Sequence, residues 1–152
     1  MSSLNAFVVA VDLAERQRDA ARQALKNVQG ARQAAQAQLE QLTGYAAETQ
    51  GRWGLKAGAA VQPEVMHHHY HFMGRLDHAI GLQTQTLRGQ DQRVAQARQT
   101  LLQAELRLAS LRKVLERRRA ELAQQQQRRE QKQTDERASQ RAAARADSLN
   151  QG

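Results

Sequence analysis

The sequence predicts an all-α protein, an antiparallel two-helix coiled-coil hairpin with an extended C-terminal helix. Three observations predict this fold: a helix-forming composition, a seven-residue repeat of apolar side chains, and one break rich in glycine. Gln, Ala and Arg supply 70 of the 152 residues, and only five residues are aromatic. A globular core of this length needs many more large apolar side chains, whereas this composition with a heptad period is typical of coiled coils. Because cysteine is absent, a disulfide scaffold and a cysteine-ligated metal site are excluded.

The expected elements follow from helix formers and breakers. The first helix is expected over about residues 3–57, which contain no proline and consist mostly of helix formers. A turn is expected at about residues 58–63, because closely spaced glycines precede Pro63. Proline favours the first position of a helix, so the second helix is expected over about residues 64–145. We expect residues 146–152 to be a flexible tail and the whole chain to be a single domain.

The heptad repeat is continuous in both arms. Every seventh residue from Met66 to Leu122 is apolar, in nine positions out of nine, and twelve of the fifteen a and d positions from Leu4 to Trp53 are apolar. Sustained seven-residue spacing predicts a left-handed supercoil. The residues expected to form the core are Leu25, Leu39, Leu42, Met73, Ile80, Leu87, Val94, Leu101, Leu108, Leu115 and Leu122.

The register predicts where the pairing ends. If the chain reverses near residue 60, position i faces roughly position 121 minus i, so the first arm is used up at about residue 120. The heptad leucines stop at Leu122, and four glutamines follow from Gln124. This agreement favours an intramolecular hairpin with a polar helical overhang of about 25 residues over a parallel dimer.

The net charge of +8 is concentrated in the last third of the chain. Residues 107–152 carry twelve basic and six acidic side chains. The densest part is the cluster Arg112, Lys113, Arg117, Arg118 and Arg119. A solvated coiled-coil flank explains some of these charges, and an acidic partner surface is the second interpretation. Nucleic acid is a third, but no aromatic residue follows Phe72 to stack on bases.

No pattern in the sequence indicates catalysis or a membrane span. There is no nucleophile–base pair, carboxylate dyad or phosphate-binding glycine loop, so we expect no enzyme activity, no catalytic residue, no cofactor and no small-molecule substrate. The longest apolar run, Ala6 to Val11, is too short to cross a bilayer. No signal peptide is visible, and we expect a cytoplasmic protein.

The histidines near the turn allow two interpretations. His67 and His71 are one helical turn apart, which suits two imidazole ligands. No carboxylate or cysteine stands at a matching position, so we expect no metal site. The alternative is a partly exposed helix start, with His69 in the seam between the arms.

Phe72 lies at a g position, at the edge of the predicted seam. With Leu76 and Ala79 it makes a stripe at i, i+4 and i+7. A large apolar group at a rim often marks a partner site. Equally, Phe72 could fold over the turn and seal the tip of the hairpin.

Three short segments of the chain resemble the FliJ family of the bacterial flagellar type III export apparatus. The segment Tyr70–Ile80 resembles the family's Phe-x-x-x-Leu-x-x-Ala-Ile element, and Leu115-Glu116-Arg117 resembles its Leu-x-Glu-Arg element. The segment Glu130–Ala138 looks like its closing Asp-Glu-x-Ala element. Their order and spacing make the match fairly specific, and it covers essentially the whole chain.

The resemblance implies a non-enzymatic hairpin similar to the central stalk of rotary ATPases, located in the cytoplasm at the inner membrane beneath the flagellum. It implies binding to the hexameric export ATPase through the paired helix ends and the C-terminal region. In this chain these are the segments Leu4 to Arg22 and Arg112 to Arg145, which include the basic cluster defined above. It also implies contact with the cytoplasmic domain of the membrane export gate through Phe72, Leu76, Ala79 and Gln83, although relatives often carry His at the Gln83 position. Export chaperones are further partners that the resemblance implies.

The hypothesis from the sequence is therefore an adaptor of flagellar protein export, needed for flagellum assembly and motility. Two alternatives stay open. One is a basic coiled coil associated with nucleic acid, and the other is the equivalent stalk protein of a virulence type III secretion system.

Overall fold

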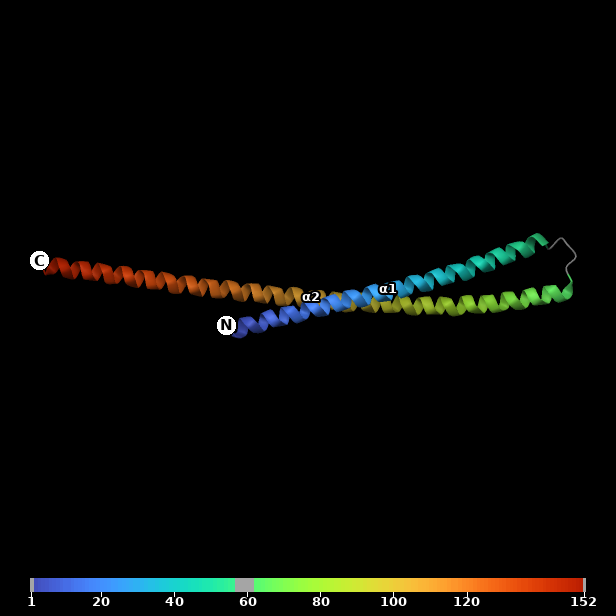
Figure 1. Ribbon diagram of the computed structural model, residues 1–152, viewed down its shortest axis with the longest axis horizontal. Coiled ribbons are helices and arrows are strands. Elements are labelled where there is room, and N and C mark those ends of the chain that lie inside the picture. The colour runs from blue at the N-terminus through green and yellow to red at the C-terminus, as the bar shows by residue number, and fades with distance from the viewer. Residues whose placement is uncertain (1, 57–61, 152) are drawn as a thin grey trace. The chain divides into compact units, whose positions relative to one another are not determined.

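The computed structural model describes residues 2–56 and 62–151, which form two long helices (Figure 1). Helix α1 spans Ser2–Lys56 and helix α2 spans Pro63–Asn150. Each observed boundary lies close to the expected one, except that α2 ends later. The predicted turn at residues 58–63 falls mostly on residues 57–61, which lie outside the described residues. The predicted all-α hairpin of two packed helices is confirmed.

The start of α2 has a clear local cause. Pro63 is the first helical residue and Glu64 is an acidic residue in the first turn, as the helix dipole favours. The carbonyl oxygen of Gln62 accepts hydrogen bonds from the backbone N–H groups of Val65 (3.1 Å) and Met66 (3.2 Å). The bond from Met66 is the first regular bond of the helix, and the bond from Val65 satisfies a donor that has no other partner within the helix.

The end of α2 differs from the expectation. Residues 146–150, expected to belong to a flexible tail, are helical, because α2 continues to Asn150. The backbone N–H of Gln151 donates to the carbonyl oxygen of Asp147 at 3.2 Å. Alanine and arginine dominate this stretch and both favour helix.

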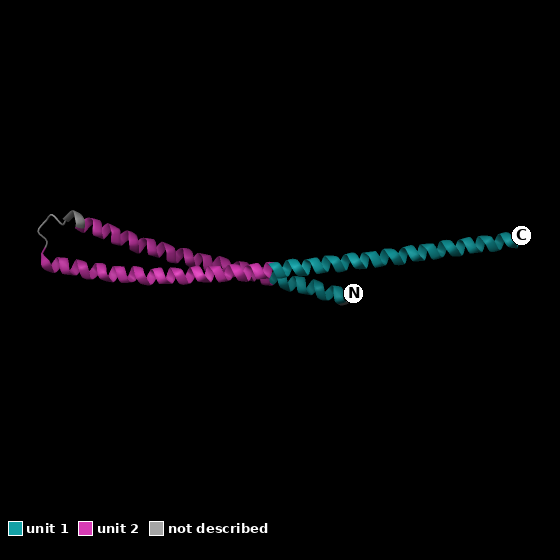
Figure 2. Ribbon diagram, turned by 180° about the vertical axis from the view of Figure 1, so that it is seen from behind, with its two compact units in different colours: residues 1–16, 106–152 teal, residues 17–105 magenta. Residues whose placement is uncertain are grey.

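The chain divides into two compact units, which we describe separately (Figure 2). The tip unit is residues 17–105, and the terminal unit is residues 1–16 together with residues 106–152. Both units contain segments of α1 and α2. No helix in the described ranges holds a stretch long and apolar enough to cross a membrane.

In the tip unit, α1 and α2 run antiparallel and share a narrow seam. Its buried residues are Ala21, Ala35, Leu76 and Val94. Because two of these are alanines, the helices can approach closely. The expected core residues that are partly buried here are Leu25, Leu39, Leu42, Met73, Ile80, Leu87 and Leu101. A two-helix seam leaves one side of each such residue open, so complete burial is rare.

The register of the tip unit agrees with the prediction from the turn position. The predicted counterpart of Arg32 is residue 89, and its Nε donates to Oδ1 of Asp91 at 2.6 Å. The predicted counterpart of Trp53 is residue 68, and its ring stacks on His69 with 4.2 Å between ring centroids. The contacts therefore lie within one helical turn of their expected places.

In the terminal unit, the first turns of α1 pack against only the beginning of the α2 segment. Ala14, Leu108 and Leu115 are buried, with 2%, 2% and 7% of their surface exposed. From Glu116 to Gln151 every residue is exposed. The polar helical overhang expected from the sequence is therefore present. The last residues that contact α1 lie between Leu115 and Arg119.

Leu122 departs from its predicted place in the core, since 38% of its surface is exposed. The register places it just beyond the start of α1, which begins at Ser2. Too little of α1 remains there to cover a leucine side chain. The repeat of apolar residues thus runs one heptad beyond the burial.

Candidate partner-binding surfaces

An aromatic pair lies on the surface of the tip unit. The rings of Tyr45 in α1 and Phe72 in α2 meet edge to face, with 6.0 Å between centroids and an interplanar angle of 83°. Tyr45 is 52% exposed and Phe72 is 39% exposed. Aromatic pairs favour this geometry, which holds both rings at the edge of the seam without covering either.

The stripe expected on the surface of α2 is exposed unevenly. Its members are Phe72, Leu76, Ala79 and Gln83. Phe72 is exposed, Ala79 and Gln83 are partly buried, and Leu76 is buried with 8% of its surface exposed. Leu76 occupies a d position and therefore packs between the helices. The Nε2 of Gln83 donates a hydrogen bond across the seam to the carbonyl oxygen of Ala35 at 3.0 Å.

The sequence did not lead us to expect Tyr45 in this surface, although its heptad position indicates it. Tyr45 precedes the a-position residue Ala46, and Phe72 precedes the a-position residue Met73. Both are therefore g positions, and g positions face one another along one side of an antiparallel pair. Combining the two heptads with the register places Tyr45 between two g positions of α2, those of Phe72 and Ala79.

The histidines beside the tip pack against each other and against tryptophan. The rings of His67 and His71 stack with 5.4 Å between centroids, and His69 stacks on Trp53. His69 is partly buried, in line with the interpretation that places it in the seam. Within the described residues, no group of three or more potential ligands is arranged to hold a metal ion.

The basic cluster of the terminal unit is partly engaged with α1. An Nη of Arg112 donates to a carboxylate oxygen of Glu15 at 3.0 Å, and the guanidinium of Arg118 lies 5.5 Å from the centroid of the Phe7 ring. The other three members, Lys113, Arg117 and Arg119, are exposed. None of these three makes an ion pair with a described residue. Two members of the cluster thus contact side chains of α1, and the other three point to solvent.

A groove lies beside these arginines, between the two helices of the terminal unit. Its volume is about 390 Å³. The apolar part of its lining is Val8, Val11 and Leu115, and Arg112 and Arg119 stand on its α2 side. The acidic side chains Asp12 and Glu116 complete the lining. The groove combines an apolar floor with charges of both signs.

The first turns of α1 are apolar on two faces. Phe7, Val11 and Ala14 face α2, whereas Val9 and Leu13 on the outer face are 62% and 54% exposed. A helix that is apolar all round is normally covered on more than one side. The heptad repeat predicts only the face that packs against α2, so the sequence did not indicate this second apolar face.

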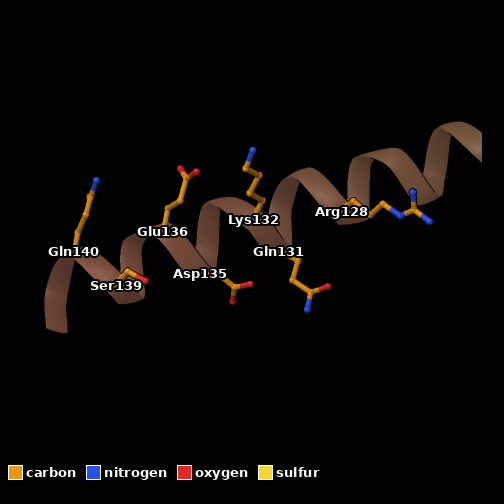
Figure 3. Close-up of a pocket in the computed structure, with 7 residues that line it drawn as sticks. All are labelled: Arg128, Gln131, Lys132, Asp135, Glu136, Ser139 and Gln140. Carbon is orange, nitrogen blue, oxygen red and sulfur yellow. The ribbon is translucent and has the colours of Figure 1, made fainter. Parts of the chain in front are cut away.

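The overhang of α2 offers charge and amide groups but no enclosed site. Figure 3 shows Lys132 and Glu136 on one side of the helix and Gln131 and Asp135 on another. The shallow depression along it is lined by residues of this single helix: Arg128, Gln131, Lys132, Asp135, Glu136, Ser139 and Gln140. Since no second element closes it, this surface suits a macromolecular partner rather than a small molecule.

These surfaces, on a long two-helix hairpin, are consistent with a protein that works by binding other proteins. The family model described as "Flagellar FliJ protein" matches residues 4–147. The chain belongs to the FliJ family. The resemblance seen in the sequence is therefore confirmed, and membership makes the protein a non-enzymatic component of type III export that is associated with the export ATPase complex.

A solved structure supports the fold of this FliJ family member. A protein from Chlamydia trachomatis, CT670, described as a YscO homologue, superposes with a TM-score of 0.71. The match covers 91% of this chain and 90% of the other, at 17% sequence identity. At that identity the similarity shows the shared helical hairpin and nothing about partners. A search of curated protein sequences finds no match.

Proposed function

We propose that this protein is a cytoplasmic stalk-like adaptor of flagellar protein export, with one binding surface in each unit. The terminal unit binds the ring of the hexameric export ATPase, and the tip unit contacts the cytoplasmic domain of the membrane export gate. The observation that carries the proposal is the family match over residues 4–147 on a long antiparallel hairpin. Because the matching model is the flagellar one, we favour the flagellar apparatus over a virulence secretion system.

Two features of the terminal unit support the ATPase assignment. The outer face of α1 exposes Val9 and Leu13, which can supply apolar anchors. Lys113, Arg117 and Arg119 on α2 supply positive charge that no described carboxylate neutralises. Charge of this kind steers an acidic partner surface into place, while the apolar anchors provide most of the binding free energy.

A pull-down with the hexameric export ATPase tests this assignment. Leu13→Ser is expected to weaken retention of the ATPase about tenfold or more, because truncating an anchor at an interface costs 1–2 kcal/mol or more. The matched control is Leu82→Ser in the tip unit, since Leu82 is 53% exposed and Leu13 is 54% exposed. Equal retention of the ATPase by both variants would refute the assignment of the terminal unit.

The aromatic pair supports the gate assignment of the tip unit. Phe72 and Tyr45 form an exposed apolar surface from both helices, and exposed aromatic side chains are frequent anchors of protein interfaces. Leu76 contributes as the support beneath them, because its side chain is buried in the seam. The contact surface that we propose is therefore Phe72 with Tyr45, flanked by Ala79.

Swimming motility tests the gate contact in a flagellated bacterium that carries this protein as its FliJ. Phe72→Ala is expected to reduce the motility halo strongly while leaving helicity unchanged, because the ring is exposed and its removal opens no cavity. Tyr70→Ala is the control, since Tyr70 is 67% exposed and makes no contact with Phe72 among the observed ring pairs. Normal motility with Phe72→Ala would contradict the proposed contact between Phe72 and the export gate.

Peripheral association with the inner membrane then follows from the gate contact rather than from any lipid-binding segment. Export chaperones are proposed as further partners, without an assigned surface. The nucleic-acid alternative makes a separate prediction, because binding through residues 107–152 would weaken steeply as salt rises. Retention of the ATPase without retention of nucleic acid at moderate salt would exclude it.

A further inference from the structure

Two glutamines occupy the seam in the middle of the tip unit. Gln83 and Gln90 occupy successive d positions of α2. The amide of Gln83 reaches the carbonyl oxygen of Ala35 at 3.0 Å, whereas the Oε1 of Gln90 is buried and has no hydrogen-bond partner among the described residues. Two chemically identical side chains one heptad apart thus have different environments.

The Gln83 contact is possible because of the residue that it faces. A helix carbonyl has two lone pairs, and the helix uses one of them, so the carbonyl of Ala35 can accept a second hydrogen bond. The short side chain of Ala35, which is 7% exposed, leaves space for the amide to approach the backbone. One heptad away in either direction stand Val28 and Leu42, whose larger side chains would cover the carbonyl.

The apolar repeat alone discriminates poorly between registers. Every a position of α2 from Met66 to Leu122 is apolar, so a shift of seven residues still pairs apolar with apolar. The ion pair of Arg32 with Asp91 adds little, because both side chains are about half exposed. A single polar residue in a seam is a known means of selecting one register at some cost in stability.

We infer that Gln83 is a positioning residue, which fixes the register of α1 against α2 through its hydrogen bond to Ala35. By fixing the register it sets which residue of α1 stands beside Phe72, and in this structure that residue is Tyr45. Gln83 thus acts on the proposed gate surface from within the seam. The register itself can be measured without any partner.

Disulfide formation between introduced cysteines measures the register directly, because the chain has no cysteine of its own. Arg32→Cys is combined in turn with Asp91→Cys, which reports the observed register, and with Thr84→Cys or Arg98→Cys, which report shifts of one heptad. The full chain is oxidised at low concentration, and free thiols are counted by mass spectrometry. With Gln83 present, the pair of positions 32 and 91 is expected to dominate.

Gln83→Met keeps the side-chain size and removes the donor. It is expected to lower the ratio of observed-register to shifted disulfides about fivefold, the effect of one part-buried hydrogen bond, without lowering the melting temperature. Gln83→Lys, which keeps an N–H donor of similar reach, is expected to restore the ratio. The matched control is Gln90→Met, which removes a polar atom without a partner and is expected to leave the ratio unchanged.

Ala35→Val provides a second route to the same test, because its branched side chain covers the carbonyl from the other helix. The same fall in the ratio is expected. An unchanged ratio in both Gln83→Met and Ala35→Val, or an equal fall in Gln90→Met, would overturn the inference. Since this readout involves no gate protein, the inference and the proposed function can fail separately.

Discussion

Three successive a positions in the terminal unit show how pairing changes along one helix. Leu108 and Leu115 are 2% and 7% exposed, whereas Leu122 is 38% exposed. The residue type and the heptad position are the same, and only the presence of α1 differs. The comparison teaches that the leucine repeat marks the paired stretch only approximately, and that the helix continues where packing has ended. From Ala120 to Gln151 every residue is exposed, so this part of the helix is available to partners.

The largest expected effect separates the paired leucine from the unpaired one. Leu108→Ala is expected to destabilise the protein by about 2–3 kcal/mol, because it removes a buried side chain and leaves a cavity. Leu122→Ala is expected to cost less than about 0.5 kcal/mol, as for most surface substitutions. Denaturant unfolding followed by circular dichroism measures both. Equal losses would mean that Leu122 is covered in solution.

A smaller effect is expected at the contact of Arg118 with Phe7. Arg118→Ala removes the guanidinium from the face of the ring, and such exposed contacts contribute about 0.5–1 kcal/mol. Its neighbour Arg117 is exposed and makes no such contact, so Arg117→Ala is the stability control. If the two variants unfold at the same denaturant concentration, the contact does not stabilise the packing of α1 against α2.

The ion pair between Glu15 and Arg112 is expected to contribute less to the free energy of unfolding than the contact of Arg118 with Phe7. Its side chains are 37% and 52% exposed, so Glu15→Gln is expected to cost no more than about 0.5 kcal/mol. The loss is expected to disappear at 1 M salt, where exposed charges are screened. A loss that stays the same at high salt would point to packing by Glu15 instead of charge. Glu121→Gln in the unpaired stretch serves as the control.

The smallest effect on stability is expected from removing the overhang. A chain ending at Ala123 should melt at the same temperature as the full chain, because residues 124–151 are all exposed. Its helical signal per molecule should fall roughly in proportion to the residues removed. A clear drop in melting temperature would show that the overhang packs against another part of the protein.

The fold could be predicted from the sequence because it depends on the seven-residue repeat of apolar side chains. Heptad spacing, the position of Pro63 and the length of each arm determine the two helices and their register. The exposure of Leu122 follows from the same register, since that register leaves no residue of α1 opposite it. The flexible tail was expected from position alone, although the helix formers near the end favour the helix that is present.

The surfaces were less predictable, because they depend on which side chains meet across the seam. Leu76 occupies a d position and also belongs to the expected surface stripe. Only its burial in the structure shows that it packs in the seam and does not lie on the surface. The Gln83 hydrogen bond depends on the reach of one amide to one carbonyl. Arginines that look alike in the sequence divide into those that fasten α1, such as Arg118, and those that face solvent, such as Arg119.

The measurement that tests the account most directly is a crossed binding experiment with two partners. The full chain, Leu13→Ser and Phe72→Ala are each tested for retention of the hexameric export ATPase and of the cytoplasmic domain of the export gate. The account predicts that Leu13→Ser loses the ATPase and keeps the gate domain, while Phe72→Ala loses the gate domain and keeps the ATPase. Loss of both partners by either variant, or of neither partner by both, would contradict the assignment of one partner to each unit.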